Sequence, residues 1–329
     1  MEREEWRVVL HAVKRAAREV AKIHRAQRRL QYGDWLIVAM YLWAVAHDRP
    51  QSWACDRSHY TGVFRPRCLP SVSQFNRRMN EPRTRRVLQR VHDALAGSVA
   101  ATALTFLDGK PLTVGVASKD PDARRGHVMG GFAKGYKLHA WMTEDRRFPR
   151  WSVTPLNAHE VPVAATLVAG VAELSPRSLV LADQNYDGRD LHKVVDARGG
   201  RLVLNPKDGG KRARAAKAKA KAADGGTATT ASSAVAAAAD THPVTLRQMG
   251  PARRALLSVR AARPDLVRMA MRHRVHAEGI LGNLCGRGGG LTGLPPWARR
   301  LHRVRRWVGG KIILYHARLR VRAARRRAA

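Results

Sequence analysis

The chain has 329 residues, and its 61 Lys and Arg against 25 Asp and Glu give a formal net charge of +36 at pH 7. This excess indicates a polyanionic partner, DNA or RNA first and an anionic membrane second, although an Arg-rich proteome would also raise the charge. The three cysteines form no CxxC pair, which argues against a zinc site or a disulfide scaffold and favours a reduced, cytoplasmic setting.

Residues 1–98 are expected to form an all-helical N-terminal domain. Apolar side chains from Trp6 to Ile23 recur at helical spacing. The apolar run 35–46 predicts a buried helix and is too short to cross a bilayer. In the following segment LPSVSQFNRRM, a Ser71 or Ser73 cap would begin a basic helix. A helix-turn-helix DNA reader and a plain helical bundle fit this pattern about equally.

Beyond residue 98 the pattern changes to that of a sheet. The segments ALTFLD, PLTVGVA, KGYKLHAWM and RWSVTPL predict four strands, and a helix, a strand (SLVLAD), a helix and a strand (RLVLN) follow. This order indicates an α/β fold with mixed strand pairing. A low-complexity stretch at about 207–242 has almost nothing to bury and is expected to be a mobile insert. Helices resume after Val244, and the chain ends in a basic tail that is expected to fray.

Three carboxylates stand in separate elements of the α/β part. Asp108 ends ALTFLD, Asp183 ends SLVLAD, and Glu278 lies in the predicted helix MRHRVHAEGILGNL. Carboxylates are preferred ligands of Mg²⁺, and two such ions about 3.5–4 Å apart can cleave a phosphodiester. Each acid also has a simpler interpretation: an Asp-Gly hairpin turn at 108–109, a cap after the strand at Asp183, and an i,i+4 ion pair between Arg274 and Glu278.

Several other polar residues have two interpretations. Basic side chains that alternate along one predicted strand would face DNA or form a solvated face: Lys134, Lys137 and His139. His159 would either support a site near the phosphate or cap the helix that follows. Glu160 fits the acidic first turn of that helix. Asp187 in the segment NYDG is expected to form a turn.

Four stretches together resemble the DDE transposases of bacterial insertion sequences. They are FLDGKPLTVGVASKDPDARRG with GGFAKGYKLHAW, LADQNYDGRDLHKVV, RHRVHAEGILGNL and LPSVSQFNRRM, and they span roughly residues 30–310. In the family signature around the helical acid, Arg274 and Glu278 match. Met271 replaces the family's Tyr and Cys285 its Lys, and Arg287 is close enough to substitute for that Lys.

The resemblance implies a ribonuclease H-like mixed sheet flanked by helices over residues 99–329. It implies that Asp108, Asp183 and Glu278 are the catalytic triad and bind two Mg²⁺ ions, with Mn²⁺ as a substitute. The residues expected to contact DNA are Arg77, Arg78, Lys134, Lys137, His159 and Arg274.

The activity implied by the resemblance is metal-dependent cleavage at transposon ends and transfer of the 3′-hydroxyl into target DNA. The partner would be double-stranded DNA, bound by a homodimer at the bacterial nucleoid, without membrane association. Two alternatives remain. A nuclease of the same fold would cleave without strand transfer, and a catalytically decayed DNA-binding protein would show only salt-sensitive binding.

Overall fold

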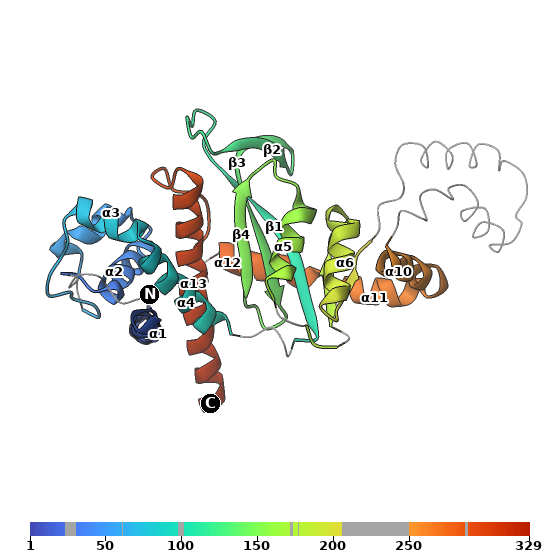
Figure 1. Cartoon of the computed structure of the whole chain (residues 1–329), viewed down its shortest axis with the longest axis horizontal. Helices are drawn as coiled ribbons and strands as arrows, with labels where there is room; N and C mark the ends of the chain where they lie inside the picture. Colours follow the sequence, from blue (N-terminus) through green and yellow to red (C-terminus); the bar gives the residue numbers. More distant parts are fainter. Residues whose placement is uncertain are drawn as a thin grey trace, which may run out of the picture.

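The computed structural model describes residues 1–23, 31–60, 62–97, 102–171, 174–176, 178–205, 250–286 and 289–329. The predicted low-complexity insert and Arg287 lie outside these residues. Figure 1 shows a helical bundle on the left, a sheet in the centre, and a further pair of helices to the right of the sheet. In the part of the chain that the structure describes, no helix has the length and apolarity needed to cross a membrane.

Both ends of the chain contribute to the helical bundle. Its helices are α1 (Arg3–Ile23), α2 (Asp34–Ala46), α3 (Val72–Asn80), α4 (Pro82–Ala96) and α13 (Leu301–Ala328). The apolar stripe predicted for the first helix is confirmed, since Trp6, Val9, Val13 and Val20 are buried. Helix α13 packs against α1, α2 and α4. The helical part is therefore not confined to residues 1–98.

The basic C-terminal segment is not a frayed tail, as the sequence had suggested, because α13 continues to Ala328. Arg325 near its end forms ion pairs with Glu2 at 2.5 Å and Glu4 at 2.7 Å. Arg318 lies 3.4 Å from Glu5 of α1. Acidic residues at the start of the chain thus hold the last helix in place.

The structure shows the plain bundle rather than a helix-turn-helix. Residues 47–71, which include the short 3-10 helices η1 (Gln51–Cys55) and η2 (Arg57–His59), separate α2 from α3. Only Glu81 separates α3 from α4. Neither connection is the three- or four-residue turn of that motif. The predicted cap is confirmed, since Ser71 and Gln74 form a capping box at the start of α3.

The sheet confirms the expected mixed pairing. Its strands are β1 (Leu104–Thr113), β2 (Arg124–Val128), β3 (Gly131–Thr143), β4 (Arg150–Pro155), β5 (Leu179–Ala182) and β6 (Arg201–Val203). The order is β2-β3-β1-β5-β6, and β4 also pairs with β3. β1, β2 and β4 are antiparallel to β3, whereas β1–β5 and β5–β6 are parallel. Antiparallel strands therefore come first, and parallel strands joined through helices follow them. This is the ribonuclease H-like arrangement.

Two strand boundaries differ from the prediction. ALTFLD and PLTVGVA were expected to be separate strands, but β1 is continuous from Leu104 to Thr113. Asp108 pairs with Ala140 and Gly109 with His139 of β3, so the Asp-Gly hairpin interpretation is wrong. The ladder with β3 outweighs the local turn preference of the dipeptide. β2 covers a segment for which no strand was predicted.

Helices cover both faces of the sheet. In Figure 1, α5 (Glu160–Ala169) and α6 (Arg189–Ala197) lie in front of the strands and α12 (Val275–Cys285) passes behind them. The helix predicted around the third acid is in fact two helices, because α11 (Pro264–Arg272) ends before α12 begins. α10 (Pro251–Ala262) precedes α11, and both lie beyond the β6 edge.

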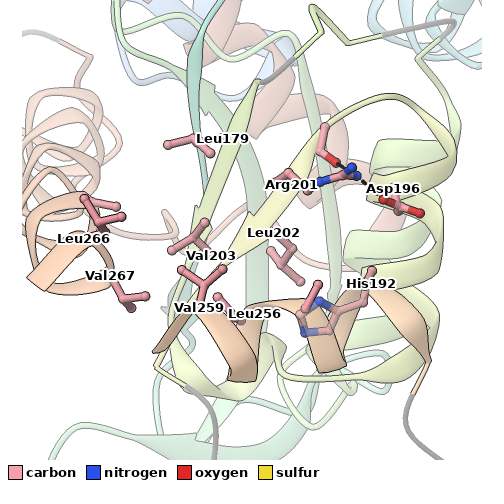
Figure 2. Close-up of a pocket in the computed structure, with 14 residues that line it drawn as sticks. Leu179, His192, Asp196, Arg201, Leu202, Val203, Leu256, Val259, Leu266 and Val267 are labelled. Carbon is pink, nitrogen blue, oxygen red and sulfur yellow. Dashed lines mark hydrogen bonds and ion pairs between the residues drawn. The ribbon is translucent and has the colours of Figure 1, made fainter. Parts of the chain in front are cut away.

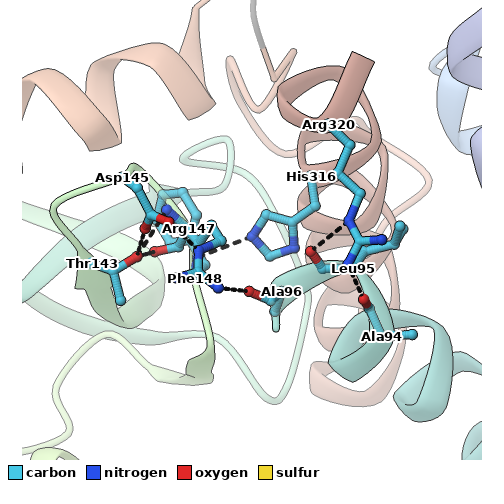
Figure 3. Close-up of polar contacts among 9 residues, drawn as sticks. All are labelled: Ala94, Leu95, Ala96, Thr143, Asp145, Arg147, Phe148, His316 and Arg320. Atoms are coloured by element: carbon cyan, nitrogen blue, oxygen red, sulfur yellow. Dashed lines mark hydrogen bonds and ion pairs between the residues drawn. The ribbon is translucent and has the colours of Figure 1, made fainter. Parts of the chain in front are cut away.

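The turn between β3 and β4 is joined to the bundle by hydrogen bonds (Figure 3). Arg147 donates to the carbonyl of Ala96 at 2.6 Å. Arg320 of α13 donates to the carbonyl of Leu95 at 3.3 Å. The Phe148 amide donates to Nε2 of buried His316 at 2.9 Å. Arginines from two other elements thus satisfy the last carbonyls of α4, which have no partner within their own helix.

Two acids in the β1–β2 connection cap the start of α13. The amide of Arg300 donates to Asp120 at 3.0 Å and that of Leu301 donates to Asp122 at 2.9 Å. Tyr136 of β3 also donates to Asp120, at 2.6 Å. Burial opposes ionisation of Asp120, but these hydrogen bonds outweigh it and hold its pKa below the usual value. The first turn of α13 is therefore anchored to the sheet.

The middle of α13 passes between α2 and β4 at two adjacent glycines. A methyl group on Gly309 would meet the Trp151 ring at 2.9 Å, and one on Gly310 would meet Val45 at 3.0 Å. Alanine normally favours a helix over glycine by about 1 kcal/mol. Here overpacking, which costs about 1–3 kcal/mol, is expected to exceed that gain.

We therefore predict that Gly309→Ala and Gly310→Ala each lower the free energy of unfolding by about 1 kcal/mol, measured by urea titration. Gly282→Ala in α12 is the matched control, because among the described residues nothing outside its own stretch of helix lies within 4 Å of its added methyl group. The control should be neutral or stabilising by up to about 1 kcal/mol. Equal stabilisation by all three substitutions would contradict the close packing of α13.

Candidate active site

Asp108 and Asp183 lie side by side on neighbouring strands. β1 and β5 are parallel, and Leu107 lies opposite Ala182. The next residues in the chain, Asp108 and Asp183, therefore lie at the same level of the sheet. Asp108 lies within β1, and its Oδ1 accepts the Gly109 amide at 2.8 Å. Asp183 directly follows β5 and caps the 3-10 helix η3 (Gln184–Tyr186), which confirms the capping interpretation. Both carboxyl groups are half-buried.

Glu278 approaches from α12 on the opposite side of the candidate site from α5. Its carboxylate lies 3.5 Å from the guanidinium of Arg274, and 65% of its side chain is exposed. The expected i,i+4 ion pair is therefore present. Arg274 sits at the N-terminal boundary of α12, and its charge reaches Asp108. The sequence prediction placed Arg274 against DNA, whereas here it lies among the acids.

The acids influence one another electrostatically. The pKa of Asp108 is raised to about 6, mainly by burial and to a smaller extent by the negative charges of Asp183 and Glu278. The Gly109 hydrogen bond and the positive charge of Arg274 act in the opposite direction. A carboxyl group that is half-buried beside two others is costly to ionise, and a bound cation would relieve that cost.

The donor set has the right chemistry for a hard divalent ion, because all three groups are carboxylates. Their arrangement is only partly assembled. Within the described ranges, no three His, Cys, Asp or Glu side chains are close enough to hold one metal ion. Asp108 and Asp183 are fixed by rigid strands, whereas Glu278 points toward solvent and Arg274.

Three polar side chains gather on the face of β1 to which Gly109 belongs, which is opposite to the face of Asp108. Lys137 of β3 forms an ion pair with Glu160 at 2.8 Å. Tyr186 is buried beside them, and its hydroxyl has no hydrogen-bond partner among the described residues. Gly109 lies against all three, since a methyl group added to it would make ordinary van der Waals contact at 3.4 Å with both the Lys137 side chain and the Tyr186 hydroxyl. Local sequence patterns do not predict that these residues meet, because they come from three separate elements.

Arg78 is not available for DNA. It was predicted to read bases together with Arg77, but only 8% of Arg78 is exposed. Its guanidinium lies 2.6 Å from Asp34 and also pairs with Glu81. Arg83 binds the other oxygen of Asp34 at 2.5 Å. Arg78 therefore ties α3 to α2, and of the two arginines only Arg77 is exposed.

The alternating basic residues of β3 do not form one exposed face. His139 is buried against Thr154, and burial lowers its pKa to about 4. Lys134 donates to the carbonyl of Ser118 at 2.7 Å, and Lys137 is paired with Glu160. Their proposed DNA contacts would have to displace or share these partners.

His159 is the N-cap residue of α5 but makes no capping hydrogen bond with its side chain, which is exposed. Glu160 is in the first turn, as expected. Asp187, predicted only as a turn former, accepts two hydrogen bonds from Arg253 of α10 at 2.7 and 2.6 Å. This bidentate pair joins the chain before the insert to the chain after it.

An apolar cavity of about 330 Å³ lies between α6, β6, α10 and α11, but it is not the candidate active site (Figure 2). Leu202, Val203, Leu256 and Val267 are among its lining residues. Leu179, which also lines it, begins β5, whereas Asp183 follows the other end of that strand. The cavity contains no carboxylate of the triad.

The raised pKa of Asp108 has a consequence for stability. A carboxyl group whose pKa is higher in the folded state does not destabilise the protein below pH 3.8, its pKa in the unfolded chain. Its destabilising effect is complete above about pH 6. Without metal, Asp108→Asn should therefore stabilise the protein at pH 7.5 by up to about 3 kcal/mol, and the gain should shrink toward pH 4.5. Urea unfolding in a chelator at both pH values measures this. Glu144→Gln, at an exposed carboxylate in the β3–β4 turn, is the control. A gain that did not depend on pH would contradict the assignment.

Comparison with known proteins identifies the family of this chain. The family described as Transposase DDE domain matches residues 101–278, which is more than half of the chain and includes all three acids. No curated protein sequence matches. Among solved structures, a piggyBac transposase synaptic complex with hairpin DNA is similar at a TM-score of 0.33 and 15% identity, over 63% of this chain and 51% of that one. The chain thus spans about half the length of that transposase. The family match shows that this chain belongs to the DDE-domain transposases.

Proposed function

We propose that the protein cleaves DNA at transposon ends and joins the freed 3′-hydroxyl to target DNA. The observation that supports this proposal is the parallel pairing of β1 with β5, with Asp108 and Asp183 at the same level of the sheet. The charge of Glu278 also acts on Asp108. The family assignment indicates DNA as the substrate. We further propose that the protein acts as a homodimer on double-stranded DNA.

In this proposal Asp108, Asp183 and Glu278 hold two Mg²⁺ ions, with Mn²⁺ as a substitute. When bound, such ions activate a water and stabilise the leaving oxygen of the phosphodiester. Asp108 and Asp183 provide fixed positions, because Asp108 belongs to β1 and Asp183 caps η3 directly after β5. Glu278 completes the set by turning away from Arg274, which releases the guanidinium toward a DNA phosphate.

Exposed basic residues would hold the rest of the DNA. Arg77 on α3 and His159 at the start of α5 are exposed. If these residues contact phosphates, replacing them with Ala should weaken binding to all sequences alike and make binding less dependent on salt. Lys134 and Lys137 remain candidates only if DNA displaces their present partners.

We predict that Asp108→Ala, Asp183→Ala and Glu278→Ala each reduce Mg²⁺-dependent cleavage by about a thousandfold or more, because residues that act as one unit fail together. DNA affinity should not fall, since each substitution removes negative charge from a basic protein. Cleavage of supercoiled plasmid and filter binding measure the two effects, with Glu144→Ala as the control.

A strand-transfer assay with pre-cut 3′ ends then separates the proposed transposase from a nuclease of the same fold. Joined products support the proposal, and cleavage without joining supports the nuclease. A single triad variant that kept near-normal cleavage would remove that residue from the site. Salt-sensitive binding without any metal-dependent cleavage would identify a decayed DNA-binding protein.

A further inference from the structure

The β2–β3 hairpin exposes an apolar and aromatic tip. Val128 pairs with Gly131, so Met129 and Gly130 form the turn. Met129 is fully exposed and Phe132 is 74% exposed. The Phe132 ring lies 4.6 Å from that of His127, its partner across the hairpin. These three side chains, His127, Met129 and Phe132, are called the hairpin tip below.

The hairpin is firmly held at its base. A methyl group on Gly126 would meet the Leu156 backbone at 2.7 Å, and one on Gly135 would collide with the backbone of Leu112. Lys134 ties the hairpin to the β1–β2 connection through the Ser118 carbonyl at 2.7 Å. Figure 1 shows β2 and the start of β3 at the upper edge of the sheet. A rigid base with an apolar tip in solvent is suited to insertion into another molecule.

The charge beside the tip indicates what that molecule is. Arg124 and Arg125 on β2 are both exposed. DNA combines a polyanionic backbone with apolar base faces, so it matches both features of the hairpin. A single exposed Met or Phe would need no explanation, but a cluster beside two exposed arginines does.

The hairpin also extends from the strand that positions the candidate site. β3 pairs with β1 at Asp108 through Ala140 and continues to Gly131 at the tip. At about 3.3 Å per residue, this part of β3 reaches at most roughly 30 Å. That length corresponds to roughly nine base pairs of a duplex aligned with the strand.

We propose that the hairpin tip inserts into bound DNA and stacks on bases at a distorted step, while Arg124 and Arg125 contact the flanking phosphates. The proposal rests on the proposed function only in taking DNA as the substrate, and it requires no cleavage. Apolar side chains that enter between base steps must unstack the bases, and new contacts offset that free-energy cost. Such side chains therefore favour DNA that is already distorted. Aromatic stacking accounts for roughly a five- to hundredfold difference in affinity per base.

The test uses the full chain carrying Asp108→Asn, so that binding is measured without cleavage. Fluorescence anisotropy compares a fully paired 30-base-pair duplex with the same duplex containing a central two-base bulge. A 2-aminopurine in the bulge reports stacking. The protein with the unmodified hairpin tip should bind the bulged duplex roughly tenfold more tightly than the paired duplex, and its binding should change the 2-aminopurine emission.

Phe132→Ala and Met129→Ala should each reduce this preference several-fold and leave affinity for the paired duplex within about twofold. Met269→Ala is the matched control, because it removes an exposed methionine from α11, away from the hairpin. Both tip residues are exposed, so thermal unfolding should be unchanged. Arg124→Ala with Arg125→Ala should weaken binding to both duplexes and reduce its salt dependence.

An unchanged bulge preference in Phe132→Ala would overturn the proposal, as would the absence of any preference in the unmodified tip. Loss of binding to vesicles of phosphatidylglycerol and phosphatidylcholine in Phe132→Ala, with the bulge preference retained, would assign the tip to a membrane instead. Failure to bind either duplex would contradict the proposed function rather than the role of the hairpin alone.

Discussion

Burial of the long C-terminal helix on several sides is the constraint that joins the two parts of this fold. Helix α13 is buried almost continuously from Val304 to Ala317. It can lie between α2 and β4 because Gly309 and Gly310 present no side chain to Val45 and Trp151. β4 pairs with β3, and β3 pairs with the strand that carries Asp108. The position of the candidate site therefore depends on how the last helix of the chain packs.

The net charge of +36 overstates the positive charge that is available to DNA. Arg78 neutralises buried Asp34, Arg253 binds Asp187 in a bidentate pair, and Arg147 and Arg320 cap the end of α4. Arginine suits such work because its planar group offers five donors in a fixed geometry. Contacts with DNA are therefore to be sought among exposed arginines rather than inferred from the total charge.

The candidate site combines a rigid part and an adjustable part. Parallel strands fix Asp108 and Asp183, and the cost of this arrangement appears as the raised pKa of Asp108. Glu278 is exposed and paired with Arg274, so its carboxylate can turn without disturbing the core. This division is consistent with the proposed function, because the least constrained of the three carboxylates is also the most exposed.

Local sequence patterns determined the order of the elements, the buried face of α1, the Ser71 cap and the three acids in separate elements. Each depends on residues a few positions apart, so periodicity and capping rules suffice. Only the tertiary structure decided that Asp108 lies inside a continuous strand, that Arg78 is buried, and that Asp120 caps α13. The partners of these residues lie far away in the chain, and a neighbour brought close by folding outweighs any local preference.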